Sequence, residues 1–161
     1  NLIKQTDYFF KDGDIVNRTI YNYGCNFMCH LAIVYPRCTY EDVLNLYSAC
    51  IANRTMMSNC TVKDPNGVAK TIASFYGVDS ARQIGGKDSS SHYGIQFPDE
   101  RIDHILHRHK TLTGLHFTAS LCIKGENIYY DPYEARKGVY SINIVDNNIQ
   151  QSYYAGGWIN G

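Results

Sequence analysis

The chain has 161 residues, with 15 Lys+Arg and 15 Asp+Glu, so its formal net charge is zero. This length predicts one domain, spanning residues 1–161, with a core of ordinary size. The charge balance argues against a nucleic-acid or membrane-surface partner held by bulk electrostatics. No apolar run approaches the roughly 18–20 residues that span a bilayer, so we expect no transmembrane segment. Both the cytoplasm and release to the cell wall stay open as locations, and the oligomeric state is left open.

The N-terminal third sets the first chemical question. The first twenty residues mix aromatic side chains with a DGD turn signal and predict a short extended piece and a turn. The following stretch, YGCNFMCHLAIVYP, predicts a helix from Cys25 to about Tyr35, because Pro36 disfavours helical geometry in the residue before it. Cys25 then lies in the first turn, where the helix dipole favours a thiolate. An inert buried cysteine fits the same position, so the partners of Cys25 decide between the two.

Two further helices have clear start and stop signals. Thr39 is a helix cap with an acid three residues later, which predicts a helix over residues 40–52. Asp64 is followed by a proline in the first turn, and Gly77 closes an apolar stripe, which predicts the next helix. Residues 53–61 between the two are polar and are expected to form a loop.

The second half changes character. Residues 79–96 predict a long surface loop that overhangs a site, and FPDERIDHILHRHK predicts another helix. LHFTASLCI, IYYDP, GVYSINIV and QQSYYAGGWI then read as strands, with a turn signal at residues 125–127. Helices followed by a meander of strands predict an α+β fold in which N-terminal helices pack on a C-terminal antiparallel sheet.

Three residues on this scaffold suggest chemistry. His116 begins the LHFTASLCI strand and Asp131 closes the IYYDP strand, so the turn between them makes the two residues cross-strand neighbours. A cysteine at a helix start, a histidine and an acid form the chemical set of a cysteine hydrolase. The imidazole takes the thiol proton, and the acid orients the ring. We therefore predict that Cys25, His116 and Asp131 converge.

At this point the sequence resembles a known family. YGCNFMCHLAIVY, DPNGVAKTIASFYGV and TGLHFTASLCIKGENIYYDPY are similar to segments of papain-like bacterial cysteine peptidases. The similarity covers about residues 20–135 and is greatest to the bacteriocin leader-peptidase (double-glycine peptidase) branch and its stand-alone relatives. The resemblance implies a papain-like fold without cofactor or metal. It also implies that Cys25 is the nucleophile, His116 the general base and acid, and Asp131 the orienting acid.

One departure concerns the oxyanion. The family normally has a glutamine five or six residues before the cysteine, and here those positions are Thr19 and Ile20. Asn22 is our candidate for the missing amide, with the Cys25 backbone N–H as a second donor; a turn asparagine explains Asn22 equally well. Tyr23 and Tyr93 are the candidate substrate-binding residues, because aromatic rings with a polar tip suit peptide or sugar surfaces as well as half-buried strand positions.

The other cysteines and histidines have simpler interpretations. Most of the six cysteines are expected to be reduced core residues, with Cys29, Cys50 and Cys122 buried. An even count also permits the bridges of a secreted, disulfide-bonded binding module. A zinc site at His104-x-x-His107 lacks a convincing third ligand, and no Cys-x-x-Cys pair exists. His30 is the fallback base if His116 points away, and His92 is expected in solvent.

The function expected from these features is hydrolysis of an amide bond through a thioester acyl-enzyme. The substrate is either a peptide segment or the stem peptide of peptidoglycan. Two alternatives stay open: a phage or bacterial peptidoglycan-degrading lysin specifically, and a catalytically inactive peptide-binding domain of the same fold. The missing glutamine is the main support for the second.

Overall fold

The computed structural model describes residues 2–4, 14–84, 102–111, 114–133 and 149–161. Its helices are α1 (Ile15–Tyr23), α2 (Cys25–Val34), α3 (Tyr40–Ala52) and α4 (Pro65–Tyr76). Its strands are β1 (Ala81–Ile84), β2 (His104–Thr111), β3 (Gly114–Ile123), β4 (Glu126–Tyr130) and β5 (Ile149–Asn160). The predicted strand GVYSINIV and the part of the predicted loop beyond Ile84, with His92 and Tyr93, lie outside the described residues.

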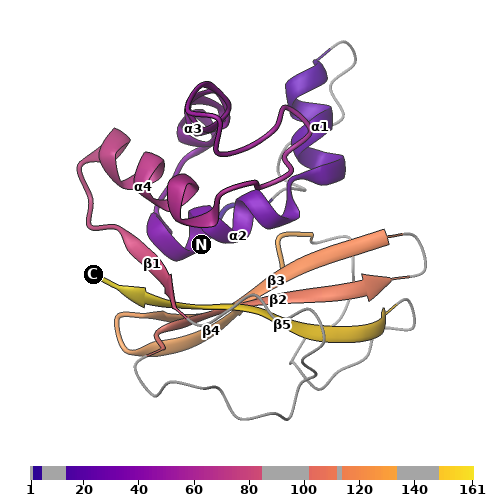
Figure 1. Cartoon of the computed structure of the whole chain (residues 1–161), viewed down its shortest axis with the longest axis vertical. Coiled ribbons are helices and arrows are strands. Elements are labelled where there is room, and N and C mark those ends of the chain that lie inside the picture. Colours follow the sequence, from indigo (N-terminus) through magenta and orange to yellow (C-terminus); the bar gives the residue numbers. More distant parts are fainter. Residues whose placement is uncertain (1, 5–13, 85–101, 112–113, 134–148) are drawn as a thin grey trace.

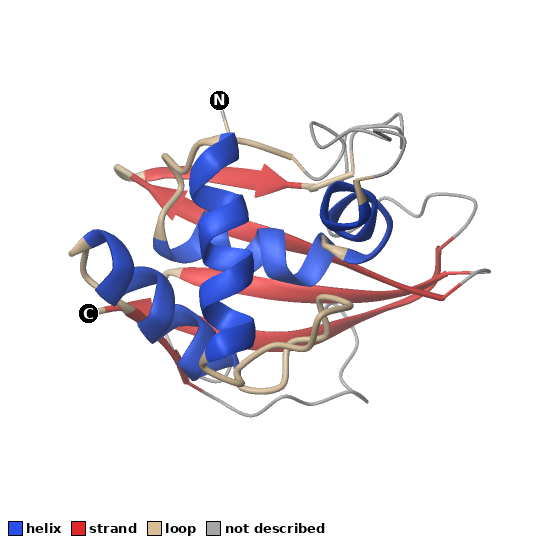
Figure 2. Ribbon diagram, turned by 90° about the horizontal axis from the view of Figure 1, so that it is seen from above, coloured by secondary structure: helices blue, strands red, loops and turns tan. Residues whose placement is uncertain are grey.

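The elements form two layers, with the helices on one face of a five-stranded sheet (Figures 1 and 2). The strand order is β1-β5-β2-β3-β4, and every neighbouring pair is antiparallel. Helix α2 packs on β3 and α4, and all of its residues from Phe27 to Val34 are buried. The α+β class and the helices-on-sheet arrangement are therefore confirmed. None of the described helices has the length and apolar character needed to cross a membrane.

Local capping explains where α3 and α4 begin, and a glycine explains where α4 ends. The Thr39 hydroxyl accepts from the Asp42 N–H while the Asp42 carboxylate accepts from the Thr39 N–H, which completes the capping box of α3. Asp64 caps α4, and Gly77 ends it in the left-handed conformation with φ 64°, which glycine adopts without strain. Helix α2 begins at Cys25 as predicted. These three helices follow signals that lie within a few residues of each end.

The first helix was not predicted. Residues 15–23 form α1, where the sequence suggested an extended piece and a turn. Asp14 caps it by accepting from the Asn17 backbone N–H at 3.1 Å. Asn17 and Ile20 are buried, and the Tyr40 hydroxyl of α3 donates to the Asn17 side chain. Contacts with a distant helix thus stabilise α1, and these leave little trace in the local sequence pattern.

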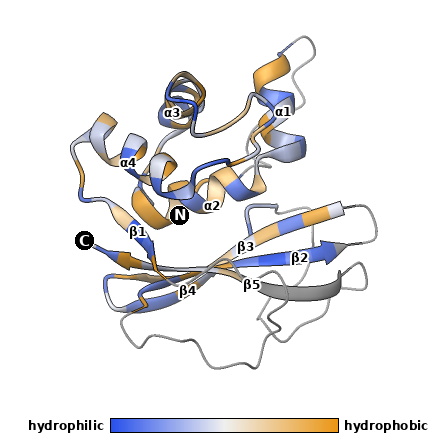
Figure 3. Ribbon diagram, viewed as in Figure 1, coloured by the Kyte–Doolittle hydropathy of each residue, from blue (hydrophilic) through white to orange (hydrophobic). Residues whose placement is uncertain are grey.

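The helix predicted over FPDERIDHILHRHK was also wrong. Its first five residues, 97–101, lie outside the described residues, and residues 104–110 belong to β2. This strand lies in the middle of the sheet between β5 and β3, although Figure 3 shows it as largely hydrophilic. Pairing on both sides satisfies its backbone, and its histidines hydrogen-bond to neighbouring side chains. Residues 81–84, predicted as loop, form β1 against the end of β5.

Candidate active site

A single glycine positions Cys25. Gly24 separates α1 from α2, and its N–H donates to the Ile20 carbonyl at 2.9 Å while its own carbonyl accepts from the Met28 N–H at 2.8 Å. A Cβ atom at Gly24 would lie 2.5 Å from the Ile20 oxygen, which is too close for a non-glycine residue in this geometry. The chain can therefore pass directly from one helix into the next. This places Cys25, which is partly exposed, at the positive end of α2.

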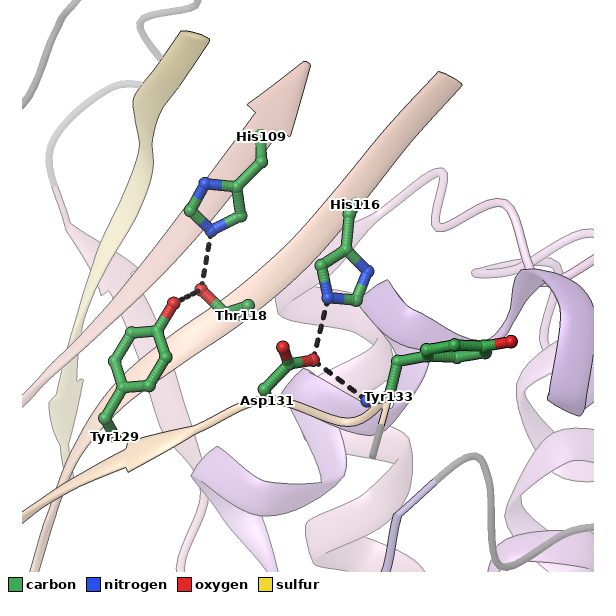
Figure 4. Close-up of polar contacts among 6 residues, drawn as sticks. All are labelled: His109, His116, Thr118, Tyr129, Asp131 and Tyr133. Atoms are coloured by element: carbon green, nitrogen blue, oxygen red, sulfur yellow. Dashed lines mark hydrogen bonds and ion pairs between the residues drawn. The ribbon is translucent and has the colours of Figure 1, made fainter. Parts of the chain in front are cut away.

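The histidine and the acid meet as the sequence predicted. His116 lies on β3, and Asp131 directly follows β4. The His116 Nε2 lies 2.8 Å from the Asp131 Oδ1, and the two residues are only 5% and 8% exposed. The Tyr133 backbone N–H donates to the same Oδ1 at 2.9 Å (Figure 4). The acid is therefore fixed against the ring by two hydrogen bonds to one oxygen.

The Cys25 thiol also interacts with His116. Burial by itself would lower the pKa of His116. Hydrogen bonds with the Asp131 and Cys25 side chains, together with the charges of both groups, outweigh burial and raise the pKa to about 9. Because Nε2 faces Asp131, Nδ1 is the nitrogen left to face the sulfur. The structure thus brings Cys25, His116 and Asp131 together, in surroundings that favour the protonated form of the imidazole.

Asn22 and Tyr23, the described oxyanion and substrate candidates, lie on the surface. Asn22 is exposed, and it lies on the opposite side of α1 from the buried Asn17 and Ile20, because successive helix residues are rotated by about 100°. Tyr23 is 64% exposed and ends α1, two residues before Cys25. The roles of both residues stay predictions, and a donor for the oxyanion other than the Cys25 N–H is not evident among the described side chains.

The fallback histidine has a structural environment. His30 is fully buried, its Nδ1 lies 2.8 Å from the Asn26 carbonyl, and its ring packs edge-on against Trp158. Burial lowers the pKa of His30 to about 4, although the hydrogen bond to Asn26 opposes this. A neutral, enclosed imidazole in this position packs the core, and His116 is the histidine that faces Cys25.

The three histidines of β2 hydrogen-bond to neighbouring side chains. His107 Nε2 lies 2.6 Å from the Ser120 hydroxyl, and His109 Nε2 lies 2.8 Å from the Thr118 hydroxyl. Burial and the nearby His109 lower the pKa of His107 to about 3. His104 and His107 are three residues apart on a strand, and this spacing points their side chains to opposite faces. Within the described ranges, no group of three His, Cys, Asp or Glu residues is arranged to hold a metal.

All six cysteines lie in the described residues, and all are free. Burial raises the pKa of Cys38 and of Cys60 to about 12 and that of Cys50 to about 11, so these thiols stay neutral. Cys29 is buried as well, as expected. The prediction for Cys122 was wrong, because it is only partly buried near the end of β3, beside the turn into β4. With every cysteine free, a disulfide-bonded module finds no support.

Two residues of the site escaped the sequence reasoning. The ring of Tyr133 packs edge-on against His116 with centroids 6.5 Å apart, and Tyr21 of α1 packs edge-on against Tyr133 at 5.8 Å. The position of Tyr133, two residues after the acid, was the available signal. Tyr21 offered none, because its partner lies 112 positions away.

Comparison of the chain with known proteins finds no match to a family model, a curated protein or a solved structure.

Proposed function

We propose that the protein is a cysteine hydrolase that cleaves an amide bond through a thioester acyl-enzyme. The observation that carries this proposal is the environment of His116, which has a carboxylate on one nitrogen and a thiol beside the other. A buried imidazole with these two partners is the arrangement that activates a cysteine nucleophile. The helix start at Cys25 supplies a further positive field.

The residues divide the reaction between them. The Cys25 thiolate attacks the amide carbonyl and forms a tetrahedral oxyanion, toward which the Cys25 backbone N–H at the helix start is available as a donor. His116 then donates its proton to the leaving amine, and the thioester forms. In the second half, neutral His116 takes a proton from water, which attacks the thioester and releases a carboxylic acid and the Cys25 thiolate, so that the thiolate and the protonated His116 are both restored. Asp131 keeps the ring oriented and stabilises the imidazolium throughout.

We further propose that the fold is papain-like and that the chain is related to the leader-peptidase branch and its stand-alone members. The order of nucleophile, histidine and acid along the chain supports this proposal. So does the division of the site between layers, because the helical layer carries Cys25 while the sheet carries His116 and presents Asp131. The substrate is a peptide segment or a peptidoglycan stem peptide.

One observation favours a second candidate function. Asn22 is exposed, and the positions where the family carries its glutamine hold Thr19 and Ile20. Loss of one oxyanion donor typically costs about 10²- to 10³-fold in rate. A domain of the same fold that binds a peptide without cleaving it is therefore the alternative, and it predicts a Cys25 that reacts slowly with alkylating agents.

The test compares purified cell walls with a peptide library. We expect cleavage of one of them, with product release abolished by Cys25→Ala and by His116→Ala. Cys122→Ala is the matched control, because Cys122 is also partly exposed but lies toward the far end of β3 from His116.

Iodoacetamide provides the readout that does not depend on substrate. An activated Cys25 is alkylated near neutral pH faster than Cys122, and His116→Ala removes this advantage. Full activity of Cys25→Ala would contradict the nucleophile assignment. No cleavage of either substrate, together with slow alkylation of Cys25, would favour the peptide-binding domain.

A further inference from the structure

Tyr133 contacts both members of the histidine–acid pair. Its backbone N–H donates to the Asp131 Oδ1, and its ring packs edge-on against the His116 ring at an interplanar angle of 80°. The side chains of Asp131 and His116 both lie on the same side of the hairpin as Tyr133 in Figure 4. Tyr133 therefore contacts the acid through its backbone and the base through its ring.

The acid depends on this contact for its orientation. Both hydrogen bonds to Asp131 end on Oδ1, while Oδ2 is buried with no hydrogen-bond partner among the described residues. A carboxylate held through one oxygen can rotate about its side-chain bonds if one of the two donors moves away. A buried oxygen without a partner also favours rotation toward water. Keeping Tyr133 in place therefore keeps Asp131 aimed at His116.

Tyr21 of α1 contacts Tyr133. The two hydroxyl groups lie 3.5 Å apart, and the rings meet edge-on at an interplanar angle of 67°. Tyr21 lies on α1, which leads through Gly24 directly into Cys25. Helix α1 thus contacts Tyr133 through the Tyr21 side chain, and its C-terminal end leads into the nucleophile.

We propose that Tyr21 is a positioning residue, which acts through Tyr133 to hold Asp131 and His116 in register with Cys25. This inference rests on the proposed function for its catalytic consequence, but the structural link from Tyr21 to His116 does not. Within the part of the chain that the structure describes, the groups that face His116 are Asp131, Cys25, His109 and Tyr133. Tyr21 reaches the imidazole through the last of these.

The experiment follows the His116 ring by NMR titration in wild type, Tyr21→Ala, Tyr21→Phe and Arg18→Ala. Loss of the Tyr21 ring loosens Tyr133 and Asp131, so in Tyr21→Ala the pKa of His116 falls from about 9 toward its ordinary value of about 6.5. Tyr21→Phe keeps the ring contact and retains most of the wild-type titration. Arg18→Ala alters an exposed residue on the same helix and leaves the titration unchanged.

Kinetics on a cleaved substrate give the second readout. Tyr21→Ala lowers kcat by about 10- to 100-fold with little change in KM, because misplacement of a catalytic group by about 1 Å costs rate on this scale. A Tyr21→Ala protein that melts at a lower temperature but titrates His116 as wild type does would overturn the proposal and leave Tyr21 with a packing role only. The titration needs no substrate, so this outcome is distinct from failure of the hydrolase proposal.

Discussion

Replacement of Asp131 by asparagine tests the electrostatic core of the site. Asparagine has nearly the same shape as aspartate and still offers a carbonyl oxygen to His116, but it removes the negative charge. Burial is the largest influence on His116 and lowers its pKa. With the carboxylate gone, the Cys25 side chain alone opposes burial. We therefore expect the pKa of His116 in Asp131→Asn to fall well below 9, to 6.5 or less.

The size of the effect follows from linkage. His116 has its pKa raised from 6.5 to about 9 in the folded protein, and one pKa unit corresponds to about 1.4 kcal/mol. The protonated ring therefore contributes on the order of 3 kcal/mol to the free energy of unfolding. Because the pKa is raised on folding, this contribution is fully present below pH 6.5 and is lost as the pH rises through 9.

The assay is urea unfolding from about pH 6 to about pH 9.5 for wild type and Asp131→Asn, with His116 followed by NMR. The difference between the two proteins follows the His116 contribution, because Asp131 does not contribute to the raised pKa of Cys38, Cys50 or Cys60. Asp131 does help to raise the pKa of Cys29, but burial is the larger cause and keeps that thiol neutral in both proteins. The difference should be about 3 kcal/mol near pH 6 and shrink toward pH 9.5. Asp79→Asn, which alters an exposed acid, is the control and should follow wild type. A difference that does not vary with pH, or a wild-type His116 that titrates near 6.5, would refute the reasoning.

Three further predictions concern the scaffold. Gly24→Ala should lower the melting temperature and slow the alkylation of the neighbouring cysteine, because the new Cβ would lie 2.5 Å from the Ile20 oxygen; an unchanged protein in both measurements would contradict the close approach. His107→Gln should reduce the loss of unfolding free energy on acidification. Burial lowers the pKa of His107 to about 3 in the folded protein, so below about pH 6.5 the ring is protonated in the unfolded chain first, which favours unfolding. Urea unfolding from about pH 6.5 to about pH 4 measures this, and an equally steep loss in both proteins would argue against it. Thr39→Ala should lower the free energy of unfolding by about 1 kcal/mol. Asp42→Ala should lower it by no more than that. A loss near zero in Thr39→Ala would show that the capping box of α3 contributes little.

Much of the candidate site was legible in the sequence because its signals are local. Two short stretches of chain carry these signals. One is the start of α2 with Cys25, and the other is the β3–β4 hairpin with its turn, His116 and the adjoining Asp131. A tight antiparallel turn fixes the register of the two strands, in which Ala119 pairs with Tyr130. Asp131, the next residue, therefore lies diagonally from His116 and within reach of it. The caps of α3 and α4 were equally local.

The sequence by itself therefore determined the helices α2, α3 and α4, the β3–β4 hairpin and the candidate catalytic residues Cys25, His116 and Asp131. Only the tertiary structure decided α1, the strand identity of β2 and the contact of Tyr21 with Tyr133. The polar, histidine-rich sequence of β2 is not typical of a buried strand. It is buried because His107 and His109 hydrogen-bond to Ser120 and Thr118 of the neighbouring strand. Likewise, α1 depends on Tyr40 of another helix. Such stabilisation comes from partners outside the segment itself, and periodicity within one segment carries no record of them.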